Sequence, residues 1–185
     1  MTTQITIAYG DGIGYEIMDA ALLVMREAGA ALDVEIVQMG EEEYRLGAPN
    51  GFDNRTLRAI QRSGILLKAP TIDPALIENL DEGEFVPVSA ALYSALELPT
   101  QERSYIFADA PEFTAISSVG ENCAVFESAL AAGDVENPAG IILAATHMLR
   151  HTGQVEVAER IGAALLAVLA SGEFSVDAVV AKLAI

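Results

Sequence analysis

Strand-like and helix-like patterns alternate through the first 70 residues, and this alternation constrains the fold more than any other feature. Alternating polar and β-branched residues predict the strands, and apolar residues at helical spacing predict the helices. The expected elements are strands at residues 4–8, 32–38 and 65–67, with helices at 17–28 and 54–62 between them. Such βαβαβ order predicts right-handed crossovers and a largely parallel sheet.

The rest of the chain continues this pattern less regularly. Helices are expected after Asp73-Pro74 and from Pro87 to Leu98, because Asp caps helices and Pro is tolerated in a first turn. Two strands are expected at 105–108 and 123–126, separated by a segment with no clear period, and three helices at 138–152, 155–170 and 176–183. We therefore predict an α/β fold over residues 1–185, a single domain with three layers: a mostly parallel twisted sheet with helices on both faces.

Composition excludes several classes of partner. A net charge of −17 and a pI near 4.2 argue against a nucleic-acid polymer or an anionic membrane, because long-range repulsion would oppose the encounter. Cys123 is the single cysteine, so no internal disulfide can form, and a small core residue is the favoured interpretation. The chain shows neither a signal-peptide pattern nor an apolar run of membrane-spanning length, so we expect a cytoplasmic protein.

A glycine-rich turn follows the first predicted strand. The segment Gly10-Asp11-Gly12-Ile13-Gly14 can turn tightly and present backbone amides at a helix N-terminus, where an anion is favoured. Its spacing matches neither the dinucleotide fingerprint nor a Walker pattern, so the turn alone is a weak signal.

Several motifs in the same order resemble the isocitrate/isopropylmalate dehydrogenase family of β-decarboxylating dehydrogenases. In that family the first strand runs into Gly-Asp-Gly-Ile-Gly-Pro-Glu, and here Tyr15 replaces the proline. The family's Lys-Gly-Pro-Thr turn after the third strand is similar to Lys68-Ala-Pro70-Thr71. Further motifs similar to its C-terminal part are Cys123-Ala-Val-Phe-Glu127, Glu136-Asn-Pro138 and His147-Met-Leu-Arg-His151.

The resemblance implies an isopropylmalate-dehydrogenase-like large domain without the family's second domain. Residues 1–98 resemble one half of that large domain and residues 104–185 the other. The second domain would follow the first half and would carry the catalytic tyrosine and lysine and most of the dimer interface. Here the chain passes from Leu98 to Tyr105 within a few residues, so the resemblance identifies no catalytic residue.

Basic residues are scarce where the family binds its substrate. Arg103 is the only Lys or Arg between Lys68 and Arg150, against thirteen Asp and Glu. The family's arginine-bearing helix corresponds to residues 88–98, which contain no arginine, and Tyr93 falls about where one would be. A phenol does not replace a bidentate guanidinium facing a carboxylate.

The resemblance implies NAD as the cofactor to test. Its binding residues would be the Gly10–Gly14 turn, Lys68, Pro70, Thr71 and Asn137. The family's adenine-contacting His-Gly-Ser-Ala-Pro stretch is reduced here to residues 128–134, and helix capping explains Asn137 without a cofactor. Lys68 could neutralise a ligand phosphate or carboxylate, and an internal salt bridge is the equally weighted alternative.

Metal-binding signals are sparse. Asp109 falls where the resemblance implies a metal-binding aspartate, with Glu112 near it, but one or two carboxylates do not make a magnesium site. A solvated loop charge is the favoured interpretation. His147 and His151 have a zinc-site spacing without a third ligand, so a structural role is favoured for both.

Three functions remain open. The first is a member that is catalytically incompetent alone and binds a nucleotide or small ligand, or regulates a partner. The second is an NAD-dependent oxidoreductase of 2-hydroxy acids completed by a partner dehydrogenase subunit. The third is an interaction module, in which loss of the second domain leaves an apolar face for a homodimer through a non-family interface. Candidates for that face are Phe85, Val86, Val88, Leu92 and Leu96.

Overall fold

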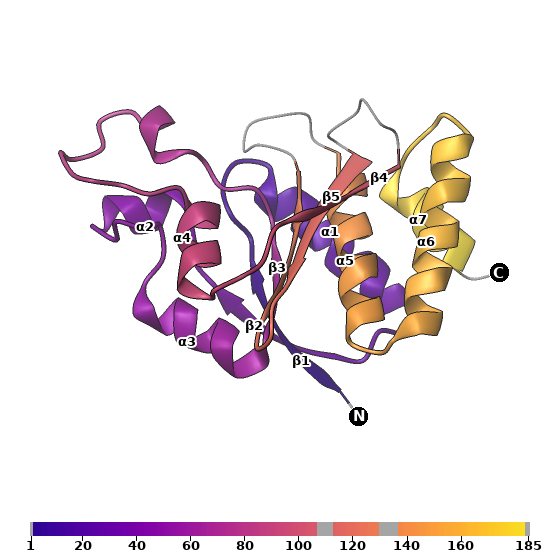
Figure 1. Ribbon diagram of the computed structural model, residues 1–185. Helices are drawn as coiled ribbons and strands as arrows, with labels where there is room; N and C mark the ends of the chain where they lie inside the picture. The colour runs from indigo at the N-terminus through magenta and orange to yellow at the C-terminus, as the bar shows by residue number, and fades with distance from the viewer. Residues whose placement is uncertain (1, 107–112, 130–136, 184–185) are drawn as a thin grey trace.

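A mixed, mostly parallel sheet organises the chain (Figure 1). The computed structural model describes residues 2–106, 113–129 and 137–183. The strand order is β2-β1-β3-β6-β5-β4, in which β2, β1, β3 and β6 are parallel and β5 and β4 are antiparallel to their neighbours. The strands are β1 (Thr3–Ala8), β2 (Leu32–Val37), β3 (Ile65–Lys68), β4 (Glu102–Tyr105), β5 (Thr114–Val119) and β6 (Ala124–Ser128).

Helices cover both faces of this sheet, which confirms the predicted three-layer α/β fold. One face carries α1 (Gly14–Glu27), α5 (Ala139–His151), α6 (Val155–Ala170) and α7 (Val176–Leu183). The other carries α2 (Glu41–Arg45), α3 (Asn54–Ser63), α4 (Val88–Ala95) and the single 3-10 turn η1 (Pro74–Leu76). In the described part of the chain, no helix has the length and apolarity needed to cross a membrane.

Side-chain alternation along the central strands builds two cores. Ile65 and Leu67 of β3 pack toward α1 and α5, whereas Leu66 packs into the cluster formed with α3 and α4. In β6, Phe126 packs into the first of these clusters and Val125 into the second. Successive residues of a strand point to opposite faces, so a continuous apolar run is what a sheet covered on both sides requires.

Capping residues and a glycine fix several helix ends where the sequence predicted them. The Asp53 carboxylate caps α3 by accepting hydrogen bonds from the amides of Arg55 and Thr56 at 2.9 and 2.8 Å. Gly64 follows the helix in the left-handed conformation at φ 72°, which favours glycine. The predicted helix after Asp73-Pro74 is a single 3-10 turn, with Asp73 as its cap.

The prediction was wrong for three elements. The strand expected at 105–108 is β4, which occupies Glu102–Tyr105, while residues 107 and 108 lie outside the described part. Strand β5 and helix α2 were not expected at all. Of the residues expected on an apolar dimer face, Val88 and Leu92 of α4 are 1% and 0% exposed and belong to the core, whereas Val86 is 40% exposed. The homodimer itself stays a prediction.

Candidate functional site

The loops after β1 and β3 meet at the carboxyl edge of the sheet. The chain crosses from one side of β1 to the other between β2 and β3, and ligands of open α/β sheets bind at such a switch point. Here the two loops touch, because the amide of Asp11 donates to the Pro70 carbonyl at 2.8 Å. Gly10 has a positive φ of 67°, and a Cβ at this position would collide with the same carbonyl. The crevice between β1 and β3 is therefore closed by backbone contact.

The Asp11 side chain strengthens this closure. Its two carboxylate oxygens accept hydrogen bonds from the amide of Glu41, at the start of α2, and from the amide of Ile72, at 2.9 and 2.8 Å. Burial raises the pKa of the Asp11 carboxyl, and the two amides partly oppose that rise. Asp11 thus joins three loops that are distant in sequence.

Two separate depressions flank the closed crevice. The β1–β2 depression has a volume of about 420 Å³ and includes Gly10, Asp11 and Gly12 in its lining. The β3–β6 depression has a volume of about 290 Å³ and includes Lys68, Pro70 and Thr71. The structure therefore divides six of the predicted cofactor-binding residues between two concavities.

A buried ion pair forms part of the β3–β6 depression. Lys68 is the last residue of β3, Glu127 is the penultimate residue of the adjacent parallel strand β6, and the two residues are paired in register. The Lys68 Nζ lies 2.8 Å from the Glu127 Oε2, and the two side chains are 2% and 5% exposed. The sequence left an external anion and an internal salt bridge as equal alternatives for Lys68, and the salt bridge is the one formed.

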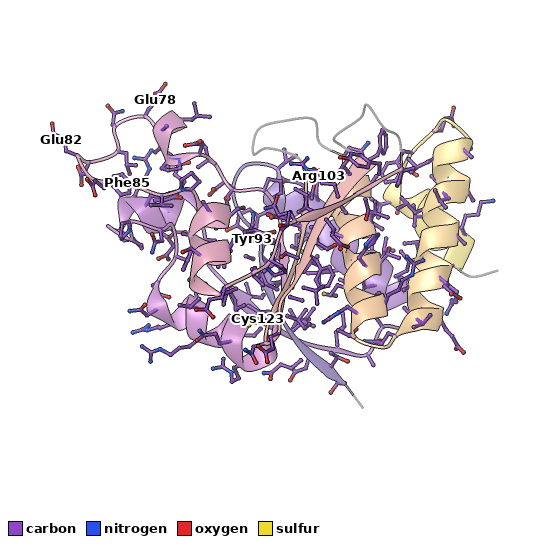
Figure 2. The ribbon with its side chains drawn as sticks, in the orientation of Figure 1. Glu78, Glu82, Phe85, Tyr93, Arg103 and Cys123 are labelled. Carbon is purple, nitrogen blue, oxygen red and sulfur yellow. The ribbon has the colours of Figure 1, made fainter. Side chains whose placement is uncertain are left out.

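Helix α4 completes the surroundings of Glu127. The Tyr93 hydroxyl donates to Glu127 Oε1 at 3.0 Å, and the Ser89 hydroxyl donates to Oε2 at 3.2 Å. Figure 2 shows Tyr93 between α4 and the sheet. Burial and then the Glu127 charge raise the pKa of Tyr93 far above its ordinary value, so the phenol stays a donor at neutral pH. We call Lys68, Ser89, Tyr93 and Glu127 the Glu127 cluster.

The other predicted site residues have simpler surroundings. Asn137 accepts a hydrogen bond from the Ala139 amide at 2.9 Å, which is the capping role expected without a cofactor. Ile13 precedes α1 and packs partly against the core. Asp109 and Glu112 lie outside the described residues. Within the described ranges, no three His, Cys, Asp or Glu side chains gather as metal ligands.

Comparison with known proteins finds relatives of one segment of the chain. No protein-family model matches the chain. A segment of 72 residues, 39% of this chain, is 49% identical to the isocitrate dehydrogenase [NADP] of Rickettsia typhi, of which it covers 15%. This segment of the chain is similar to isocitrate dehydrogenases. The chain spans a small part of the length of these curated relatives.

Solved structures agree on the fold of this isocitrate dehydrogenase relative. The isocitrate dehydrogenase from Methylococcus capsulatus matches with a TM-score of 0.83 at 15% identity, over 99% of each chain. The β-decarboxylating dehydrogenase from Thermococcus kodakarensis, in its apo form, matches with a TM-score of 0.79 at 12% identity, over 100% of this chain and 96% of that one. At these identities the likeness establishes the isocitrate/isopropylmalate dehydrogenase-like fold.

Glu127 was not predicted as a site residue. A signal was present in the sequence, since Lys68 and Glu127 each directly follow an expected buried strand, at 65–67 and 123–126. Adjacent parallel strands bring such ends together, and a buried ammonium requires a partner. The contacts of Asp11 with Glu41 and Ile72 left no comparable signal, because nothing in the local sequence pairs these segments.

Proposed function

We propose that this chain is a non-catalytic relative of isocitrate dehydrogenase that binds a nicotinamide dinucleotide in the β3–β6 depression. The observation that carries the proposal is the Glu127 cluster. Three donors that could hold a ligand anion, from Lys68, Ser89 and Tyr93, are already bound to an internal carboxylate. The protein's own Glu127 thereby takes the place of an external anion.

Catalysis on isocitrate would require cations that this depression does not offer. Isocitrate carries three carboxylates, and its oxidative decarboxylation needs them held in a fixed orientation. Among the described residues, Lys68 is neutralised by Glu127, and Arg45 is bound to Glu41 and to the Glu78 carbonyl. Arg103 on β4 is exposed, and one guanidinium does not bind three carboxylates (Figure 2). These arrangements support binding without turnover.

Polar groups in the depression suit part of a nucleotide. Thr71 and Gln101 line it beside Ile116, so hydrogen-bonding groups and an apolar wall share one concavity. With Lys68 and Glu127 cancelling each other, its charge is near neutral, which favours an uncharged ring and ribose over a phosphate. We expect the phosphates of the dinucleotide to lie outside this depression.

Two measurements on the purified chain test the proposal. First, isocitrate and isopropylmalate are each incubated with Mg²⁺ and with NAD or NADP, and formation of the reduced nicotinamide is followed by absorbance. We expect no rate above a protein-free blank, and turnover would overturn the non-catalytic assignment. Second, NAD and NADP are titrated into the protein by calorimetry, where saturable heat is expected.

Matched variants locate that binding. Thr71→Val should weaken dinucleotide binding by about fivefold, the equivalent of one hydrogen bond of about 1 kcal/mol. Thr100→Val changes an exposed threonine that does not line the depression and should leave the affinity unchanged. Absence of heat with both dinucleotides, or equal affinity of the two variants, would refute the proposed binding site.

A further inference from the structure

The β1–β2 depression is a second concavity that the proposed function does not use. It lies between the glycine-rich loop after β1 and the segment that joins β2 to α2, and its volume of about 420 Å³ lies within the range of small-molecule sites. The contact between Asp11 and Pro70 separates it from the β3–β6 depression. The lining residues that bear on a ligand are Asp11, Tyr15, Gln38, Met39, Glu42 and Arg45.

Tyr15 provides an aromatic platform in this depression. Its ring stacks on Tyr9 with centroids 4.9 Å apart and an interplanar angle of 14°. The Tyr9 hydroxyl donates to Asp19 at 2.8 Å, which fixes the supporting ring. Tyr15 nevertheless remains 48% exposed. Since Tyr9 covers one face of the Tyr15 ring, the other face is left for a planar ligand to stack on.

Charges in the depression select against anions. Three carboxylates, from Asp11, Glu41 and Glu42, face one guanidinium, Arg45. Arg45 is already engaged, because it donates to Glu41 at 2.6 Å and to the Glu78 carbonyl at 3.1 Å. A phosphate would therefore meet net negative charge in a protein that carries −17 overall. Phosphate-free ligands are favoured.

Acceptors remain for a ligand that donates hydrogen bonds. Both Asp11 oxygens accept backbone amides, so Asp11 acts as part of the wall. Among the described residues, the exposed Glu42 carboxylate accepts one long hydrogen bond, of 3.4 Å, from the Gln38 side-chain amide. Glu42 can therefore accept from hydroxyl groups, and Gln38 can exchange hydrogen bonds with the edge of a heterocycle.

We propose that the β1–β2 depression binds an uncharged nucleoside, with its base stacked on Tyr15 and its ribose hydroxyls donating to Glu42. The aromatic platform accounts for the base, the carboxylate accounts for the sugar, and the net negative charge excludes the phosphorylated forms. Buried Met39 supplies the apolar floor. This site is independent of the dinucleotide binding proposed for the β3–β6 depression.

Tyrosine fluorescence and calorimetry with adenosine test this inference directly. The chain has five tyrosines and no tryptophan, so a base stacked on Tyr15 should quench the intrinsic emission. We expect saturable binding of adenosine and at least about tenfold weaker binding of AMP, because the phosphate is repelled. Tyr15→Ala should weaken adenosine binding by roughly 5-fold to 100-fold, the range found for single base–aromatic stacks.

Matched controls make the result decisive. Tyr105→Ala removes a similarly exposed tyrosine on β4 and should leave the adenosine affinity unchanged. Tyr15→Phe should bind adenosine with the wild-type affinity, since the aromatic ring is kept. No binding of adenosine, equal affinity for AMP, or no loss in Tyr15→Ala would each overturn the proposal. Thr71→Val distinguishes the two sites, because it should weaken dinucleotide binding and leave adenosine binding intact.

Discussion

Asp11 and Glu127 are both carboxylates at the carboxyl edge of the sheet, but different kinds of donor satisfy them. Asp11 accepts two backbone amides, which carry no net charge, and it joins the loops of β1, α2 and β3. Glu127 accepts an ammonium, a hydroxyl and a phenol from β3 and α4. The first carboxylate positions backbone, whereas the second neutralises a cation that would otherwise be available to a ligand.

The two carboxylates therefore make two different sites unavailable: Asp11 helps to fill a crevice with backbone, and Glu127 occupies the donors of a depression that stays open. The crevice between β1 and β3 is closed by backbone contact between the two loops, and the Asp11 side chain supports that contact. The β3–β6 depression remains a concavity, and its anion-binding donors are occupied by one side chain, Glu127. The shape of this edge and the charge of the depression therefore depend on different groups.

The largest effect is expected from Glu127→Ala. This change leaves the Lys68 ammonium buried without its counter-charge, and breaking a buried pair in this way costs about 3–5 kcal/mol of unfolding free energy. Urea denaturation measures the loss. Glu35→Ala, which breaks the exposed pair with Arg62, provides the control and should cost no more than about 1 kcal/mol.

A second substitution keeps this prediction testable if Glu127→Ala does not fold. Glu127→Gln retains an acceptor for Tyr93 and Ser89 but removes the negative charge, so it should be destabilised by less than the alanine variant and still by more than Glu35→Ala. Equal losses for Glu127→Gln and Glu35→Ala would mean that the buried charge pair contributes no more than an exposed one.

An intermediate effect is expected from Asp11→Ala. Two amide groups of the loops lose their acceptor, and the expected loss of unfolding free energy is about 2–3 kcal/mol. Asp73→Ala removes an exposed aspartate that caps only the 3-10 turn, and it should cost about 1 kcal/mol or less. Similar losses in the two variants, measured by urea denaturation, would mean that Asp11 does not hold the loops together.

How far the sequence could predict the fold depends on whether each element carries its own signal. Helices α6 and α7 have the predicted bounds, because their apolar faces repeat over several turns. Strand β5 was missed because Ala115, Ile116 and Ser118 are buried on both faces, which removes the alternation that reveals a half-exposed strand. Helix α2 has five residues, too few for a period to appear.

One part of the candidate site could also be predicted from the sequence and another part could not. The Gly10–Gly14 turn and the Lys68–Thr71 turn were recognised because each is a contiguous motif after a buried strand. Their separation into two depressions could not be predicted, since it depends on the contact between Asp11 and Pro70. That contact joins residues 59 positions apart through one backbone hydrogen bond, and such bonds leave no compositional trace.

The smallest effect is a pH dependence that separates Asp11 from an ordinary surface aspartate. Burial raises the pKa of the Asp11 carboxyl, whereas the amide of Thr56 lowers the pKa of the Asp53 cap. A raised folded-state pKa means that the folded protein binds the proton more tightly than the unfolded chain does. The part of Asp11's contribution to stability that depends on its ionisation is therefore fully present below its ordinary pKa of 3.8 and is lost as the pH rises through the folded-state value.

For Asp53 the sign is reversed, so its contribution is present above its ordinary pKa and is lost as the pH falls through the folded-state value. Denaturation of the wild type, Asp11→Asn and Asp53→Asn at a series of pH values between about 3 and 7 measures both effects. The stability of the wild type relative to Asp11→Asn should fall as the pH rises, and relative to Asp53→Asn it should increase. Parallel trends for the two variants would mean that Asp11, despite its burial, titrates like a surface cap and that its backbone amides outweigh the cost of desolvation.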